Sequence, residues 1–362
     1  MQEKILNLQQ DALTGKPVKQ EKLTVDQHFQ DWFRTKITNL KATTYAGYVQ
    51  LYDTHIKPVF GGLQVKALDY RRINAFYELL DEKGLSKRTV AYIAFVLKSG
   101  LDDAVRKGII PSNPAKLAAK RTQDKKEARY LNQDEMRLLL DAAVGERLED
   151  AYILALHTGL RPGEWLGLPW DAVNLEERKL TVKQGLKELA GKVFLGDVKT
   201  NAGRRTITLP PAAVAALKRQ KKRQLEDRLA AGEKWNNEHN LVFTTRTGSP
   251  LRRTGIAKRE WRRVLFRMAE KSLEKKFGRP LTKEEKKDRD RLIRQAGLHD
   301  VTFHTLRHTH ASVLIFQGVD PKALSKRLGH TNIAFTLQVY GHLLPGQDER
   351  AADAVETFFK TL

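Results

Sequence analysis

The spacing of apolar residues constrains this chain most, because it divides the chain into two parts. Over 24–114 the apolar side chains recur at helical spacing, and no strand pattern is needed to account for them. A breaker cluster at 111–114 ends this part. Residues 115–129 are then basic with few apolar anchors, which is the composition of a linker. We predict a helical domain over 21–115, a basic linker over 116–129 and a second domain over 130–348.

Local signals place the helices of the first domain. Thr43 and Thr44 are expected to cap its second helix, which Pro58 and the Gly61-Gly62 pair end. Ser86 is expected to cap a later helix.

The second domain carries both helical and strand signals. Asn132 with Glu135 predicts a capping box, and Gly159 ends an apolar helix. Strand-like alternation occurs at 180–182, 192–194 and 205–209, with a turn at 201–203 that would join the last two in a hairpin. After Pro211 the chain is mostly helical, and 267–297 looks like an exposed, charged helical insertion. The predicted fold is mainly α with a small antiparallel β-sheet.

The charge balance points to a polyanionic partner. Lys and Arg number 65 against 43 Asp and Glu, a net charge of +22, which favours nucleic acid first and an anionic membrane surface second. No apolar run reaches the roughly 18 residues of a membrane span, and the N-terminus lacks the features of a secretory signal. Cysteine is absent, which excludes disulfides, cysteine nucleophiles and thiolate metal sites. These features fit a cytoplasmic protein.

Residues 1–20 allow two interpretations, a frayed leader or the remnant of a further N-terminal domain.

Five short segments of the second domain carry side chains suited to chemistry on a phosphodiester. They lie at 158–164, 198–200, 304–308, 328–330 and 339–342. Arg161 and Arg307 could clamp the nonbridging oxygens, because a planar guanidinium binds phosphate at two points.

The remaining polar groups of these segments complete such a reaction. Tyr340 could form a covalent phosphoryl link, but its pKa of roughly 10 requires neighbours that take its proton. His304 and His330 could serve, and Lys199 could protonate the leaving oxygen.

A metal site is the alternative for the histidines. His304 and His308 are four residues apart, on one helical face, and His310 follows closely, so a zinc pair is conceivable. The glutamate of a His-Glu-x-x-His motif is missing, however, and Arg307 would repel a cation.

The ordered set closely resembles the catalytic domain of tyrosine recombinases of the phage integrase family, most strongly over 130–350. The family's motif arginine corresponds to Arg161, with Glu164 as the motif's structural acid, and its hairpin lysine corresponds to Lys199. Its His-x-x-Arg box, its Leu-Gly-His histidine and its nucleophile correspond, in that order, to His304, Arg307, His330 and Tyr340.

The resemblance implies a mechanism and an assembly. Tyr340 would form a 3′-phosphotyrosine with a free 5′ hydroxyl, without metal, ATP or other cofactor. The two domains would form a C-shaped clamp around double-stranded core-site DNA, and four protomers would exchange strands to integrate or excise a phage or mobile element. The tail at 349–362 would dock on a neighbouring protomer or pack on its own, and accessory DNA-bending proteins are further candidate partners.

DNA contacts outside the catalytic set are expected from exposed polar and basic residues of the first domain and the linker. They are Thr43, Thr44, Lys87, Arg88, Lys120, Arg121, Lys125 and Lys126.

Other functions stay open beside the recombinase. A type IB topoisomerase would share the tyrosine chemistry, and a non-catalytic DNA-binding protein could share the fold. A metal-dependent nuclease is disfavoured because no acidic cluster at metal-ligand spacing is present. A membrane-surface protein is disfavoured because no basic amphipathic helix with an aromatic face is present.

Overall fold

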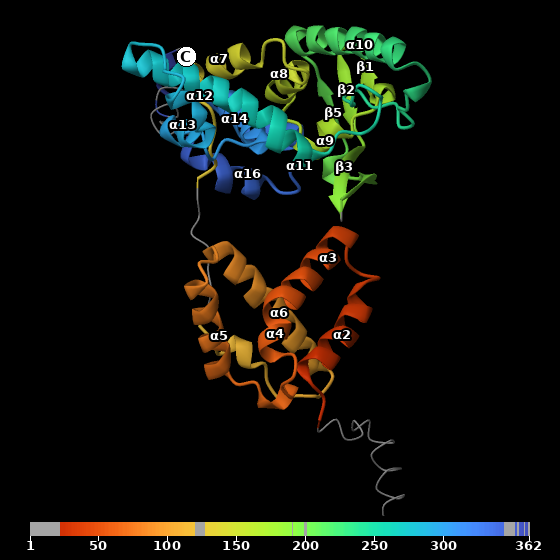
Figure 1. Ribbon diagram of the computed structural model, residues 1–362, viewed down its shortest axis with the longest axis vertical. Coiled ribbons are helices and arrows are strands. Elements are labelled where there is room, and N and C mark those ends of the chain that lie inside the picture. Colours follow the sequence, from red (N-terminus) through yellow and green to blue (C-terminus); the bar gives the residue numbers. More distant parts are fainter. Residues whose placement is uncertain are drawn as a thin grey trace, which may run out of the picture. The chain divides into compact units, whose positions relative to one another are not determined.

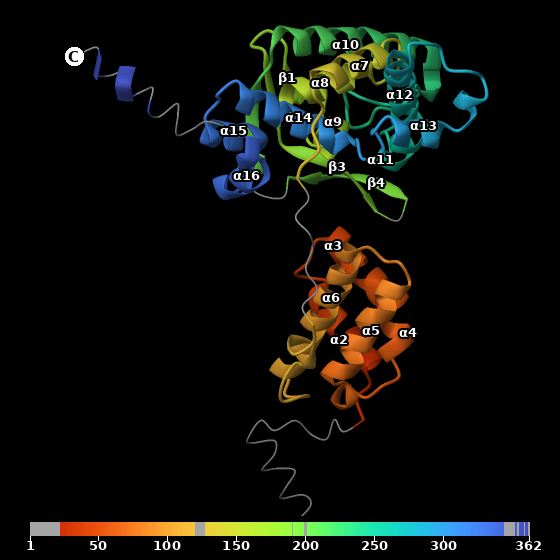
Figure 2. The same cartoon turned by 90° about the vertical axis from the view of Figure 1, so that its left-hand side faces the viewer.

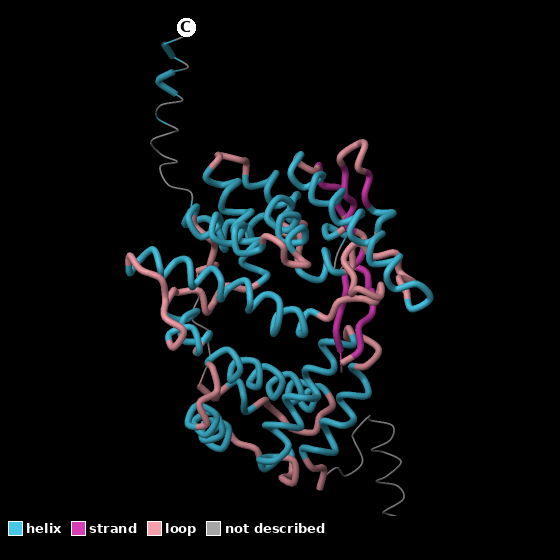
Figure 3. Tube along the Cα trace, turned by 45° about the horizontal axis from the view of Figure 1, so that its top comes forward, coloured by secondary structure: helices cyan, strands magenta, loops and turns pink. Residues whose placement is uncertain are grey.

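A computed structural model describes residues 22–119, 127–189, 191–198, 201–343, 352, 355–357 and 359–360. The chain divides into two compact units, Met1–Lys126 and Glu127–Leu362. Figure 3 shows helices and loops but no strand among the described residues of the first unit, whereas strands gather along one side of the second. The fold is mainly α with small antiparallel sheets, as predicted.

The first unit is a helical bundle (Figure 1). Its α-helices are α2 (Val25–Lys36), α3 (Ala42–Leu51), α4 (Lys57–Phe60), α5 (Tyr70–Glu82) and α6 (Lys87–Arg106). Side chains of Thr24, Asp69 and Ser86 accept backbone N–H groups at the starts of α2, α5 and α6, which satisfies donors that a helix leaves free. The predicted cap at Ser86 is confirmed.

Two predictions about the second helix of this unit are wrong. Thr43 and Thr44 lie inside α3 rather than capping it, because the carbonyl of Lys41 already accepts the N–H groups of Thr44 and Tyr45. Pro58 does not end the helix either, whereas the Gly61-Gly62 pair does, as predicted, since α4 stops at Phe60 and Gly61 follows it. A π-helical turn over Tyr52–Ile56 changes the hydrogen-bond register just before α4, so the missing N–H of Pro58 falls at the start of a new turn.

The core of the first unit is built around Phe29. Its ring stacks on Tyr52 with a centroid distance of 4.7 Å. On another side it meets the backbone of α6 at Gly100, where an added Cβ would lie 2.3 Å from the ring. Gly100 is therefore required by packing, although glycine weakens a helix interior.

The second unit contains the larger helical set and all the described strands (Figure 2). The helices are α7 (Gln133–Ala143), α8 (Glu149–Thr158), α9 (Pro162–Leu166), α10 (Pro211–Ala231), α11 (Arg253–Ile256), α12 (Arg262–Phe277), α13 (Arg289–Gln295), α14 (Phe303–Phe316), α15 (Pro321–Leu328) and α16 (Ile333–Tyr340). The strands are β1 (Val173–Asn174), β2 (Lys179–Val182), β3 (Gln184–Leu189), β4 (Lys192–Asp197) and β5 (Arg205–Thr208).

Helix signals of the second unit are confirmed. Asn132 and Glu135 form the predicted capping box at α7. Gly159 ends α8 in the left-handed conformation, with φ +66°. No described helix is long and apolar enough to cross a membrane.

The predicted pairing of the strands is wrong. β4 pairs with β3 rather than with β5, and β5 pairs with β2 in a sheet of order β1-β2-β5. The sequence pattern missed β3 because Gln184–Leu189 carries Gly185 and two charged residues in place of a regular apolar alternation. The result is a separate β3–β4 hairpin between β2 and β5.

The charged stretch at 267–297 is not an exposed insertion. One face of α12 is buried in the main core through Met268, Ala269 and Leu273, and α13 buries Leu292 and Ile293. Its charges face solvent and pair with one another, for example Lys286 with Glu270 at 3.1 Å. The apolar residues of an amphipathic helix recur only every three or four positions, so a sequence that is charged overall can still bury one face.

Gly100→Ala is expected to destabilise the first unit by about 1–3 kcal/mol, because the added methyl must displace the ring of Phe29. The matched control is Gly47→Ala inside α3, where nothing lies within 4 Å of the added Cβ. Helix propensity should make that change neutral or stabilising by up to ~1 kcal/mol. Urea unfolding of the full chain, followed by hydrogen exchange of peptides from 25–110, measures both. Equal effects of the two variants would contradict this packing.

Candidate active site

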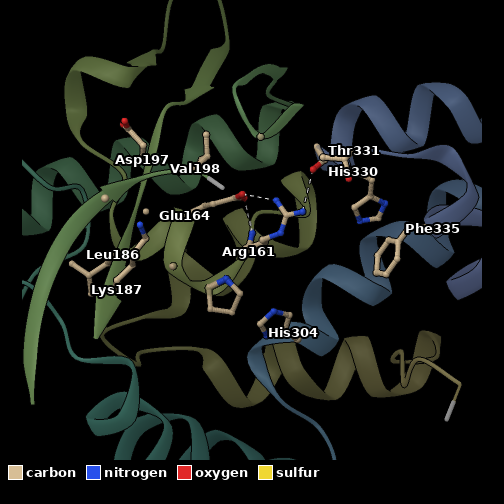
Figure 4. A pocket seen from close by; sticks show the side chains of 16 residues that line it. Arg161, Glu164, Leu186, Lys187, Asp197, Val198, His304, His330, Thr331 and Phe335 are labelled. Atoms are coloured by element: carbon tan, nitrogen blue, oxygen red, sulfur yellow. Dashed lines mark hydrogen bonds and ion pairs between the residues drawn. The ribbon is translucent and has the colours of Figure 1, made fainter. Parts of the chain in front are cut away.

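Three predicted site residues line one cavity of about 450 Å³ in the second unit (Figure 4). Arg161 lies between α8 and α9, His304 lies on α14, and His330 follows α15. Arg307 is buried on the same helix as His304 and does not line the cavity, and Tyr340 ends α16. Lys199 lies outside the described residues.

The buried Glu164 carboxylate organises the cavity. It pairs with Arg205 through two bonds, Nη2 to Oε2 at 2.8 Å and Nη1 to Oε1 at 3.2 Å. It also accepts Nη1 of Arg161 at 2.8 Å and the backbone N–H of Arg161 at 2.9 Å. Burial alone would raise the pKa of Glu164, but bonds and charge from Arg205 and Arg161 lower it to about 2. Glu164 is therefore ionised and fixes the direction of Arg161.

Arg307 is held by backbone carbonyls. Its guanidinium donates to Gly159 O and Leu328 O, each at 2.7 Å, and to His330 Nε2 at 2.9 Å. Burial, with repulsion from Arg161, lowers the pKa of Arg307 to about 9, so the group still carries its charge at neutral pH.

Two glycines permit this close arrangement. Gly159 and Gly329 both have left-handed backbones, with φ of +66° and +67°. A Cβ at Gly159 would lie 2.6 Å from the His310 ring, and one at Gly329 would lie 2.9 Å from the Ala202 carbonyl. The carbonyl of Gly329 accepts Nη2 of Arg161 at 3.1 Å. Both glycines thus bring carbonyl acceptors to the two arginines.

His330 is neutral and its tautomer is fixed. Nε2 accepts from Arg307, so the proton lies on Nδ1, which donates to Thr336 Oγ1 at 2.7 Å. Burial and the charges of Arg307 and Arg161 lower the pKa of His330 to about 3. The pKa of His304 is lowered too, by burial and then by Arg253 and Arg307.

The hydroxyl of Tyr340 does not point at these groups. The residue is 2% exposed and packs in a small apolar cluster with Leu324 and Leu328. Its hydroxyl lies 2.7 Å from His308 Nδ1. Burial raises the pKa of Tyr340 to about 12, against the opposing effect of Arg307. Burial also lowers the pKa of His308 to about 4, so His308 is neutral and accepts a hydrogen bond from the Tyr340 hydroxyl.

Sequence reasoning missed His308 as the partner of Tyr340 and Arg205 as the partner of Glu164. In this segment the sequence indicated a functional role only for Lys199. Arg204 and Arg205 are adjacent, and the sequence does not show which of the two is buried. Only the fold separates them, since Arg204 is exposed and Arg205 is buried.

The histidines do not form the alternative metal site. His310 Nδ1 lies 2.8 Å from Leu156 O, and its Nε2 accepts from Arg327 at 3.1 Å, so both nitrogens are occupied. His308 Nδ1 is bonded to Tyr340. Within the described ranges, no group of three or more His, Cys, Asp or Glu side chains could hold a metal ion.

The predicted DNA contacts of the first unit lie at helix starts. Thr43 is exposed and Thr44 half-buried in the first turn of α3, while Lys87 and Arg88 are exposed in the first turn of α6. Lys120, Arg121, Lys125 and Lys126 fall outside the described residues.

The cavity is suited to bind a phosphate and to stabilise charge that develops on it. A guanidinium has five donors, and Arg161 gives only one Nη1 and one Nη2 hydrogen to described partners. Neutral His304 and His330 add polar groups at the cavity wall. Donors fixed in advance around a transferring phosphoryl group are the usual source of catalysis in such sites.

Comparison with known proteins identifies the family. The profile described as "Phage integrase family" matches residues 129–346, and that of the "Phage integrase, N-terminal SAM-like domain" matches residues 24–80. The chain belongs to the phage integrase family. It is a site-specific DNA recombinase, an enzyme that breaks and rejoins DNA strands.

Similar proteins agree with this assignment. A tyrosine recombinase XerC-like protein of Caldanaerobacter subterraneus subsp. tengcongensis is 28% identical over 337 residues, which cover 88% of this chain and 79% of the relative. The Tn1549 transposon integrase, solved with a circular intermediate DNA, has a TM-score of 0.71 at 22% identity and covers 92% of this chain and 99% of its own. A lambda integrase tetramer on a Holliday junction has a TM-score of 0.57 at 15% identity, covering 90% and 80%. Both solved structures share the fold of this chain.

The depressed pKa of His310 predicts a pH-dependent stability. Burial lowers this pKa from 6.5 to about 3, so between these values the unfolded chain binds a proton that the folded chain does not. Stability from this group is complete above pH 6.5 and falls as the pH drops toward 3. In that window His310→Gln should flatten the stability–pH curve by up to about 1.4 kcal/mol per pH unit.

Urea unfolding at several pH values measures this slope. His239→Gln, which changes an exposed imidazole, is the control and should leave the slope as in the wild type. If His310→Gln also left it unchanged, the buried neutral state of His310 would be refuted.

Proposed function

We propose that Tyr340 is the nucleophile of this recombinase and forms a 3′-phosphotyrosine while releasing a 5′ hydroxyl. The oxygen of Tyr340 bonds to phosphorus, the P–O5′ bond breaks, and the energy of the phosphodiester is kept in the protein–DNA link. The observation that carries the proposal is the cavity itself, where Arg161, His304 and His330 converge and Arg307 donates to His330.

Each remaining group has a role in this proposal. Arg161 and Arg307 hold the nonbridging oxygens, since both guanidinium groups are oriented by fixed partners. His304 and His330 contact the phosphate and assist proton transfer, and Lys199 protonates the leaving 5′ oxygen.

Tyr340 must exchange its partner during the reaction. Its phenol is buried, protonated and bonded to neutral His308. Attack on phosphorus requires the hydroxyl to leave this bond for the phosphate and to lose its proton. A lone protomer would thus keep its nucleophile protonated until DNA binding favours the exchange.

The substrate in this proposal is double-stranded DNA at the ends of a phage or mobile element. The solved Tn1549 integrase is a transposon protein, and the lambda integrase forms a tetramer on a Holliday junction. By analogy, four copies of this chain would act on two core sites, with both units holding the duplex as a clamp and the tail at 349–362 docking on a neighbour. Accessory DNA-bending proteins and a place in the cytoplasm beside the nucleoid complete the proposal.

The first unit would contribute DNA contacts through the starts of α3 and α6, at Thr43, Thr44, Lys87 and Arg88. The basic stretch with Lys120, Arg121, Lys125 and Lys126 would follow the phosphate backbone. These contacts should make binding strongly dependent on salt.

A covalent adduct assay tests the proposal. A nicked duplex with the DNA that flanks the gene should give a detergent-resistant protein–DNA band with the wild type and none with Tyr340→Phe. Chelator should not reduce the adduct. Tyr130→Phe, the same change at a half-buried tyrosine of the same unit, is the matched control and should retain the adduct. An adduct that persists in Tyr340→Phe, or cleavage only with added metal, would refute the proposed nucleophile.

A further inference from the structure

The β3–β4 hairpin forms one wall of the active-site cavity and is fixed in place at its base. An added Cβ at Gly163 would lie 2.8 Å from Leu186 O, and one at Gly167 would lie 2.4 Å from Leu186 N, so α9 and β3 touch backbone to backbone. Further along β3, Glu188 accepts the hydroxyl of Thr254 at 2.7 Å. The hairpin therefore contacts both α9, the helix that carries Glu164, and the start of α11.

Lys187 lies between these two attachments and lines the cavity together with Arg161, His304 and His330 (Figure 4). Lys187 pairs with Phe194, so its diagonal neighbour on the same face of the hairpin is Gly196. A Cβ at Gly196 would lie 2.4 Å from Lys187 Nζ. The missing side chain at Gly196 thus leaves the room in which the ammonium group lies.

The ammonium group of Lys187 has no hydrogen-bond or ion-pair partner among the described residues. The carboxylates that line the same cavity are engaged elsewhere. Glu164 is paired with two arginines, and exposed Asp197 lies 3.8 Å from Arg204. A half-buried cation that has no partner among the described residues, and lines the same cavity as Arg161 and His330, is suited to bind an anionic group.

We infer that Lys187 is a further DNA-binding residue of the active site, which contacts the phosphate backbone of the cleaved strand at or next to the scissile position. The inference rests on the proposed function. Lys187 supplies a charge-assisted hydrogen bond and no proton, so its role differs from the proton donation proposed for Lys199. Gly196 acts as a positioning residue, because its lack of a side chain fixes where the ammonium lies.

The test compares two leaving groups in the adduct assay. A nicked substrate with a bridging 5′ sulfur expels a thiolate, which needs no proton donor because a thiol has a pKa of about 8.5. Lys187→Met should slow adduct formation about tenfold with oxygen and with sulfur alike, the effect of losing one charge-assisted bond. It should also lower by about one the slope of log affinity against log salt. Lys199→Met should be defective with oxygen and restored by sulfur.

Further variants separate position from charge. Lys187→Arg should recover most of the rate. Gly196→Ala should slow the wild type, because it displaces the ammonium, and should have no further effect in Lys187→Met. Lys179→Met removes an exposed lysine of β2 that pairs with Glu177 and lies outside the cavity, so it should behave as wild type.

The outcomes distinguish a failure of the proposed function from a failure of the inference about Lys187. A wild type that forms no adduct would refute the proposed function and this inference with it. An active wild type with an unimpaired Lys187→Met would overturn the inference alone. Rescue of Lys187→Met by sulfur would also overturn it, since Lys187 would then be a proton donor.

Discussion

The candidate active site depends on the ion pairs that the buried Glu164 carboxylate makes with two arginines. An ionised carboxylate away from water is costly unless cations pair with it. Arg205 from β5 and Arg161 at the start of α9 meet this need. Arg205 also donates to Arg327 O at 2.7 Å, which ties β5 to the end of α15, directly before His330. Glu164 and Arg205 together thus link three segments that are distant in sequence, α9, β5 and α15.

In the proposed reaction, this arrangement separates the arginines that would bind the phosphate from the tyrosine that would attack it. Arg161 and Arg307 are fixed by carbonyls and by Glu164 before any DNA is present, so little reorganisation is needed when charge develops. Tyr340 is held apart on neutral His308, in a medium that favours its protonated form. The arginines are therefore oriented in advance, whereas the proposed nucleophile is not, which would suit an enzyme whose cleavage awaits a complete complex.

The sequence was most informative where a feature depends on neighbouring residues. The caps at Ser86 and Asn132 and the stop at Gly159 are local. Of the residues predicted from the five motif segments, Arg161, His304 and His330 line one cavity. It failed where the outcome depends on distant partners. Strand β3 lacks alternation because only Leu186 reaches the core, while its backbone lies against α9 and Lys187 lines the cavity. The bond from Tyr340 to His308 likewise joins two helices whose packing no spacing rule predicts.

The adduct-formation rate of Glu164→Gln at saturating DNA tests the central claim most directly. Gln keeps the shape of the side chain but removes the charge that orients Arg161 and Arg205. Because Glu164 is bonded to these arginines rather than to DNA in this account, the rate should fall by about tenfold or more while DNA affinity stays near that of the wild type. A folded Glu164→Gln protein with an unchanged rate, whatever its affinity for DNA, would contradict the account.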